Sequence, residues 1–359
     1  MDLRIGLLLI SLLVTASSQA KECSGGADGP GPMVLQTESL PLDTGESIRE
    51  FTFWEKGNGL FFRGESNQLF SMSLDSGKPF SLTTLNRPLS RVIDSRGEYL
   101  LADNDSWLFS IRSGEWVNYV VPERPPGSPL IHLFWHREHL YSVVLGEEGY
   151  GRQKVHLYKY RPGDRTARIV CRSHTLPKDE RYEIASGHQW PNVAFYRVET
   201  KQRGKSLLKI FEIDASRDKF LGMDWFCSFN GVDWHSWYVE GPVESVHRFG
   251  YLNGLAVKIK HPTKSLLWAD RKRCRYFDIG DESTMAPNYL KPILFTWSET
   301  KGASLLFLDK SKRGDILPPG STIKGIRERD LWLTSDMKRL FMAPLLPDNS
   351  RLLVQIGLF

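Results

Sequence analysis

Residues 91–121 read Arg91-Val-Ile-Asp-Ser-Arg-Gly-Glu-Tyr-Leu-Leu-Ala-Asp-Asn-Asp-Ser-Trp-Leu-Phe-Ser-Ile-Arg-Ser-Gly-Glu-Trp-Val-Asn-Tyr-Val-Val121. Three polar turns, two of which contain glycine, separate four short apolar runs in this stretch. Glycine accepts the positive φ that a tight turn between two strands requires. The stretch therefore predicts one antiparallel meander of four strands.

The same pattern recurs along the chain, beginning at residues 49–82. An apolar pair marks the third run of each unit, and a short polar turn follows it. The pairs are Leu69-Phe70, Leu108-Phe109, Leu157-Tyr158, Ile210-Phe211 and Leu267-Trp268, spaced 39, 49, 53 and 57 residues apart. The last comparable run, at 352–356, lies two periods further on. This predicts seven units, with six as the alternative because residues 290–325 fit the pattern poorly.

A period of about 40 to 50 residues with four strands per unit is typical of a β-propeller. The string Leu69-Phe-Ser-Met-Ser-Leu-Asp-Ser-Gly-Lys78 resembles the third-strand hairpin of quinoprotein-type and related propeller repeats. The resemblance implies an all-β, β-propeller fold in a single domain over residues 33–359, and it points to no narrower family. A pair of β-sandwiches would also contain many short strands. The units recur without a linker between them, which favours the propeller.

The final unit contains only three apolar runs, at residues 331–334, 340–346 and 352–358. An open sheet edge exposes unpaired backbone groups, so a strand from elsewhere would protect it. Residues 33–42 alternate weakly between apolar and polar side chains. We expect this N-terminal strand to complete the last sheet and to close the ring.

The first twenty residues have the composition of a secretory signal. Arg4 is followed by the apolar run 5–14 and by Ser18-Gln19-Ala20, a small-x-small cleavage site. We expect residues 1–20 to be removed and residues 21–32 to form a flexible, Gly- and Pro-rich linker. No later stretch approaches the roughly 20 apolar residues of a spanning helix. The prediction is a secreted, extracellular protein without a membrane span.

Charge and cysteine content agree with that compartment. The formal net charge is +5, with both signs scattered along the sequence, and a nucleic-acid partner is not expected outside the cell. The four cysteines, Cys23, Cys171, Cys227 and Cys274, predict two disulfides. Three pairings are open. No Cys-x-x-Cys pair indicates a zinc or redox motif.

An aromatic insertion after the fourth unit, at residues 223–240, is the predicted ligand-binding site. Aromatic side chains on a loop can stack on sugars or anchor a protein partner. The alternative is that they pack between the sheets as part of the core. The candidate residues are Trp225, Asp233, Trp234, His235, Trp237 and Tyr238.

Other motifs give weaker indications of chemistry. Asn104-Asp105-Ser106 is an N-glycosylation sequon at a predicted turn, so Asn104 is expected to carry a glycan. Residues 103–105 and 278–282 offer oxygen ligands for calcium, but neither stretch completes a calcium-binding loop. We therefore assign no metal site and no cofactor, with calcium as the alternative. The sequence contains no Gly-x-Ser-x-Gly motif.

Three functions fit these observations. The first is a secreted, non-enzymatic β-propeller that binds an extracellular protein or glycan through one face. The second is a secreted calcium-dependent propeller hydrolase resembling an esterase or lactonase, which rests on analogy of fold. The third is a structural extracellular protein. The sequence specifies neither the ligand nor the oligomeric state.

Overall fold

A computed structural model describes most of the chain, and its described residues lie almost entirely in strands and in the turns between them. The described residues are 21–23, 29–40, 44–54, 59–92, 98–103, 106–119, 130–136, 139–148, 152–165, 168–175, 183–184, 192–200, 205–214, 235–249, 254–270, 273–287, 291–317, 323–327, 330–334, 336 and 338–358.

These residues form seven sheets, named I to VII in chain order. Sheet I contains β4 (Ile48–Trp54), β5 (Gly59–Gly64), β6 (Gln68–Ser73) and β7 (Pro79–Thr84); sheet II contains β8 (Leu89–Val92), β9 (Tyr99–Ala102), β10 (Trp107–Ser110) and β11 (Glu115–Val117). Sheet III contains β12 (Leu130–His136), β13 (His139–Glu148), β14 (Arg152–Tyr160) and β15 (Arg168–Thr175); sheet IV contains β16 (Glu183–Ile184), β17 (Asn192–Thr200), β18 (Lys205–Asp214), β19 (His235–Glu240) and β1 (Lys21–Glu22).

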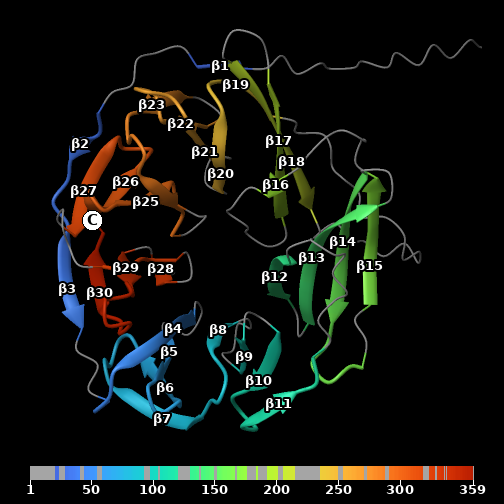
Figure 1. Cartoon of the computed structure of the whole chain (residues 1–359), viewed down its shortest axis with the longest axis vertical. Coiled ribbons are helices and arrows are strands. Elements are labelled where there is room, and N and C mark those ends of the chain that lie inside the picture. The colour runs from blue at the N-terminus through green and yellow to red at the C-terminus, as the bar shows by residue number, and fades with distance from the viewer. Residues whose placement is uncertain are drawn as a thin grey trace, which may run out of the picture.

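The remaining sheets follow the same plan. Sheet V contains β20 (Val243–Phe249), β21 (Gly254–Ile259), β22 (Leu266–Ala269) and β23 (Cys274–Phe277); sheet VI contains β24 (Ser283–Met285), β25 (Ile293–Ser298), β26 (Gly302–Phe307), β27 (Lys312–Leu317) and β2 (Gly31–Pro32); sheet VII contains β28 (Leu331–Leu333), β29 (Arg339–Met342), β30 (Leu353–Gly357) and β3 (Gln36–Leu40). Figure 1 shows the seven sheets following one another around a common centre.

The packing of sheets I and II explains why apolar residues occupy consecutive positions along the strands. Successive side chains of a strand point to opposite faces. In β5, Phe62 packs on one side into the core shared with sheet VII, whereas Phe61 packs on the other into the core shared with sheet II. Both faces of the strand are therefore buried. This arrangement requires apolar residues at consecutive positions instead of simple alternation.

Segment 21–40, which we call the N-terminal strap, contributes β1, β2 and β3, and these strands lie at the outer edges of sheets IV, VI and VII (Figure 1). β1 pairs in parallel with β19, and β2 pairs in parallel with β27. Between these two short ladders, Cys23 forms a disulfide with Cys274 of β23. Residues 21–32 were expected to be a flexible linker, and the structure places both ends of this stretch beside sheets. Main-chain pairing needs no particular side-chain pattern, so composition gave no sign of it.

The last sheet is completed from the N-terminal side of the chain. β3 lies antiparallel to β30, with its five residues in register from Gln36 opposite Gly357 to Leu40 opposite Leu353. The strand expected over residues 33–42 is thus found over a shorter range, as the fourth strand of sheet VII. In the part of the chain that the structure describes, no helix has the length and apolar character needed to cross a membrane.

Polar bridges recur at one end of the sheets. In each, a residue at the entry to a sheet meets a residue in the turn between the second and third strands of that sheet. These two segments are neighbours because the first two strands are antiparallel. The bridges are Arg87 with Asp103, Glu240 with Lys264, Glu282 with Lys301, and Asp330 with Arg351.

Candidate functional site

The bridge of sheet II lies at the surface and forms the base of the candidate site. Leu89, the first residue of β8, pairs with Ala102, the last residue of β9. The Asp103 amide donates a hydrogen bond to the Pro88 carbonyl oxygen at 2.7 Å. The connection from sheet I to sheet II is thereby held against the turn that follows β9. Arg87 Nη1 lies 3.3 Å from Asp103 Oδ2 at this point.

Two tryptophans stand on one face of sheet II beside this bridge. Trp116 of β11 pairs with Phe109 of β10, and Trp107 precedes Phe109 by two residues, so the three side chains share a face. The rings of Trp107 and Trp116 meet edge to face, with centroids 6.0 Å apart and planes at 76°. Phe109 is buried, whereas Trp107 and Trp116 are 41% and 38% exposed. Both rings therefore combine a packed side with an accessible one.

The guanidinium group of Arg87 lies against the same rings. Its Cζ atom is 3.7 Å from the ring centroid of Trp107 and 5.5 Å from that of Trp116. A cation over an aromatic face is attracted by the negative potential of the ring. The same guanidinium is paired with Asp103, so two independent contacts fix its orientation. The result is an ordered unit in which apolar faces and one ion pair lie side by side at the surface.

A third exposed aromatic belongs to the sheet that faces this one. Phe80 of β7 pairs with Ser71, and Ser71 pairs with Phe61. Phe61 packs into the core shared with Phe109 of sheet II, so Phe80 lies on the face of sheet I that points toward sheet II. Phe80 is 68% exposed. We call Phe80, Arg87, Asp103, Trp107 and Trp116 together the aromatic surface.

The residues predicted as a ligand site are only partly described by the structure. Trp225, Asp233 and Trp234 lie outside the described residues. His235, Trp237 and Tyr238 belong to β19, the outer long strand of sheet IV. Tyr238 is half-buried, and the backbone of Trp237 and Tyr238 pairs with the N-terminal strap. At least half of the predicted set therefore belongs to a regular strand instead of a loop.

The cysteine pairing left open by the sequence is settled for one bridge, Cys23 with Cys274. Cys171 lies on β15, and Cys227 is outside the described residues. The sequon residue Asn104 is outside them too, between Asp103 and Ser106 in the sequence. Glycosylation of Asn104 stays a prediction.

Two of the carboxylates considered as calcium ligands, Glu282 and Asp278, make contacts within the protein. Glu282 is buried, and its Oε1 lies 2.9 Å from Arg313 Nη1 and 3.1 Å from Lys301 Nζ. Burial by itself would raise the pKa of Glu282, but the hydrogen bonds from Arg313 and its neighbours hold the pKa below the usual value. Asp278 Oδ1 accepts a hydrogen bond from the Gly280 amide at 3.1 Å. Among the described residues, no group of three or more His, Cys, Asp or Glu side chains could hold a metal ion.

Comparison with sequence profiles of protein families finds no match, and none is found among curated proteins. Solved structures do resemble the chain. An oligogalacturonate lyase in complex with manganese superposes with a TM-score of 0.52 at 12% identity, covering 92% of this chain and 98% of that one. The chain has a β-propeller fold. The propeller predicted from the repeat is thereby confirmed.

Two further solved structures are similar over most of their length. The structure of U3-55K matches with a TM-score of 0.44 at 13% identity, over 92% of this chain and all of that one. The WD40 domain of SCAP from fission yeast matches with a TM-score of 0.41 at 13% identity, over 90% and 98%.

The aromatic surface was not predicted from the sequence, although Trp107 and Trp116 both lie within residues 91–121. A tryptophan at the accessible end of a strand and one in the core have the same sequence pattern. One signal was present: Trp107 directly follows a polar turn, and Trp116 lies on a short terminal strand, where side chains are least covered. Arg87 and Phe80 carried no comparable signal.

Proposed function

We propose that this chain is a secreted β-propeller whose function is to bind another protein through the aromatic surface. The observation that carries the proposal is the exposure of Phe80, Trp107 and Trp116 on facing sides of two neighbouring sheets. Large apolar side chains gathered at a surface gain free energy when a partner covers them. The rigid sheets beneath them keep the side chains in place, so little ordering is needed on binding.

The chemistry of the surface favours a protein over a glycan. Tryptophan and arginine dominate the residues that contribute most to protein–protein binding. A sugar chain stacks on open, flat aromatic faces, but the Arg87 guanidinium covers one face of Trp107. The two tryptophans are also inclined at 76°, so they do not form one flat platform. Phe80 adds apolar area on the opposite sheet, which suits a broad protein surface.

Secretion is part of the same proposal. The apolar N-terminal segment supports it, and the Cys23–Cys274 disulfide adds a second line of support because such bonds persist in oxidising compartments. An extracellular partner is therefore the class to search for.

The proposal is tested by photo-cross-linking on living cells. A benzophenone-bearing phenylalanine analogue replaces Phe80, where high exposure makes the larger ring tolerable. The matched control places the analogue at Val34, an 88% exposed residue of the N-terminal strap. A protein adduct that forms from position 80, not from position 34, and that disappears in the Trp107→Ala/Trp116→Ala variant is the expected result.

Two outcomes would contradict the proposal. One is an adduct that forms equally well when both tryptophans are replaced by alanine. The other is a glycan-array signal that depends on Trp107 and Trp116 without any protein adduct, which would assign the surface to carbohydrate. Circular dichroism of each variant establishes that the propeller remains folded.

A further inference from the structure

The N-terminal strap consists of two parts that are held in different ways. The downstream part, residues 33–40, contains β3 with its five-residue antiparallel ladder to β30. Met33 and Leu35 pack against the core of sheets VI and VII. Leu35 fills the space above Gly314, where an added Cβ would lie only 2.5 Å from Leu35 Cδ1. Backbone pairing and side-chain packing together fasten this part.

In the upstream part, the described residues 21–23 and 29–32 form two shorter ladders. β1 contributes two pairs, Lys21 with Trp237 and Glu22 with Tyr238. β2 also contributes two pairs, both to the start of β27. Isolated strand pairs of this length are marginal in water. Cys23, which is buried in the core of sheets IV and V, is the main anchor between the two ladders.

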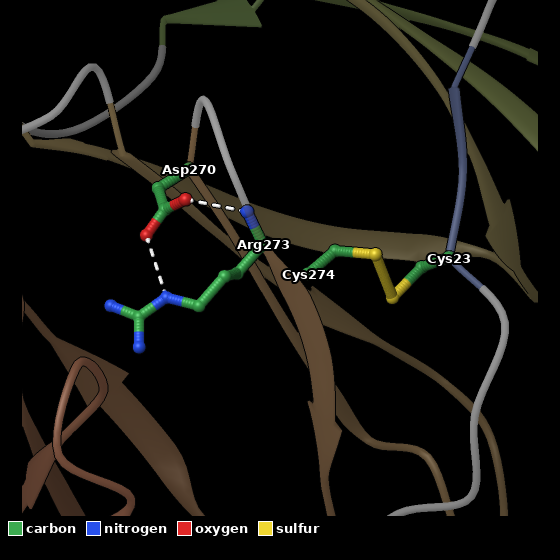
Figure 2. The surroundings of a disulfide bond; sticks show 4 residues. All are labelled: Cys23, Asp270, Arg273 and Cys274. Atoms are coloured by element: carbon green, nitrogen blue, oxygen red, sulfur yellow. Dashed lines mark hydrogen bonds and ion pairs between the residues drawn. A yellow bond between two sulfur atoms is a disulfide. The ribbon is translucent and has the colours of Figure 1, made fainter.

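The turn between β22 and β23 presents Cys274 to the strap (Figure 2). Asp270 Oδ1 accepts a hydrogen bond from the Arg273 amide at 2.7 Å, and Asp270 Oδ2 lies 3.6 Å from Arg273 Nε. These contacts hold the residue immediately before Cys274. The Cα atoms of Cys23 and Cys274 are 5.7 Å apart, a usual separation for a disulfide. The covalent anchor therefore joins a strand end that Asp270 holds through Arg273 to the short β1 segment.

We propose that β1 and Cys23 form a redox-released cover over the outer edge of β19. With the disulfide intact, β1 occupies the backbone edge of β19 at Trp237 and Tyr238. Once the disulfide is reduced, the two backbone pairs of β1 are its remaining contacts with β19 among the described residues, and β1 detaches while β3 stays in place. The outer edge of β19 then exposes its unpaired backbone groups to solvent.

The chemistry of release requires a dithiol reductant. One thiolate of the reductant attacks a sulfur of the Cys23–Cys274 bond and forms a mixed disulfide, which releases the other cysteine as a thiolate. The second thiol of the reductant then displaces the remaining cysteine and closes a disulfide within the reductant. Two electrons and two protons pass to the protein, which ends with two free thiols. Oxidation by a disulfide-bearing reagent reverses both steps.

Hydrogen–deuterium exchange tests this inference on the full secreted chain, with dithiothreitol as the reductant. We expect peptides that cover β19 to exchange about tenfold faster after reduction, because local opening controls amide exchange. Peptides that cover β3 and β30 serve as the internal reference and should keep their protection. The Cys23→Ser/Cys274→Ser variant should show the fast β19 exchange without reductant and no further change with it.

The double variant separates this disulfide from any bridge that involves Cys171 or Cys227. Unchanged protection of β19 after complete reduction of Cys23–Cys274, verified by mass spectrometry of alkylated peptides, would overturn the inference. Equal loss of protection in β19 and β30 would overturn it as well, since the strap would then detach as a whole. The exchange test does not involve the aromatic surface, so its result is independent of the test of the proposed function.

Discussion

Arg351 and Asp330 form an ion pair in which both side chains are buried: Arg351 Nη1 lies 2.8 Å from Asp330 Oδ1, and the side chains are 2% and 1% exposed. The Arg351 guanidinium also donates to the carbonyl oxygens of Ala343 at 2.6 Å and Arg49 at 3.0 Å. Arg49 belongs to the first sheet and Ala343 follows the second strand of the last one. One side chain thus connects the two sheets that lie farthest apart in the sequence.

Replacing Arg351 with methionine should lower the free energy of unfolding by about 3–5 kcal/mol, because the Asp330 carboxylate then stays buried without the positive charge of Arg351. Urea titration followed by tryptophan fluorescence measures the loss. Arg49→Met is the matched control: its ion pair with Glu65 is exposed and should contribute about 1 kcal/mol or less. Equal effects of the two substitutions would show that burial does not set the strength of the pair.

His247 gives the stability of the protein a pH dependence. It is buried on β20, with Nε2 3.1 Å from Thr284 Oγ1 of the next sheet. Burial lowers its pKa from 6.5 to about 4. Between pH 4 and 6.5 the unfolded chain binds a proton at His247 and the folded chain does not. The stability that neutral, buried His247 contributes is therefore complete above pH 6.5 and is lost as the pH falls toward 4. The difference amounts to about 3 kcal/mol.

The measurement is the free energy of unfolding of wild type and His247→Gln at pH 7.5, 5.5 and 4.5, where glutamine retains a hydrogen-bonding side chain that does not titrate. We expect the wild type to lose its advantage over the variant as the pH is lowered. Parallel pH profiles for the two proteins would refute the assignment to His247.

Gly254 is required by the ring of Trp268. A Cβ added at Gly254 would lie 2.0 Å from Trp268 Cη2, and Trp268 is buried between sheets V and VI. We expect Gly254→Ala to destabilise the fold by about 1–3 kcal/mol, because an overpacked core must shift. Gly325→Ala is the control, since nothing lies within 4 Å of its added Cβ. Thermal unfolding should show a lowered midpoint for the first variant alone.

Deleting residues 33–43 tests the contribution of β3 to the last sheet. The deletion leaves the edge of β30 without its five-residue partner. We expect the melting temperature to fall by roughly 5 °C or more and secretion to decline. Secreted yield and differential scanning calorimetry give the result. A truncated chain with wild-type melting behaviour would mean that the fold is complete without β3.

The fold was predictable because its determinants are local. Apolar runs such as Leu60 to Phe62 and turns such as Asp75-Ser76-Gly77 specify strands and hairpins wherever they occur, and Gly77 does adopt φ 65°. The short ladders of β1 and β2 were not predictable, because two backbone pairs each, formed by Lys21–Glu22 and Gly31–Pro32, need no apolar side-chain pattern. The Cys23–Cys274 pairing likewise depends on a path around four sheets that residue spacing does not encode.

The candidate site was harder to predict than the fold. The exposure of Trp107 depends on how far two sheets diverge, and the position of Arg87 over its ring depends on the path of an inter-sheet connection. Both depend on how separate segments of the chain are arranged in space, which the local sequence does not determine. The predicted aromatic stretch, by contrast, was recognisable by composition alone, and Trp237 and Tyr238 from it belong to the strand that the strap covers.

The attachment of β3 to β30 also sets an order of events during synthesis. β30 begins at Leu353, more than 300 residues after β3, and Cys274 follows Cys23 by 251 residues. At about 5–20 residues per second, the ribosome needs roughly 15 to 60 seconds to supply the partner of β3. β3 awaits its partner through that whole interval, and Cys171 and Cys227 are both made before Cys274 becomes available to Cys23. Sheet VII can therefore be completed only after β30 has left the ribosome.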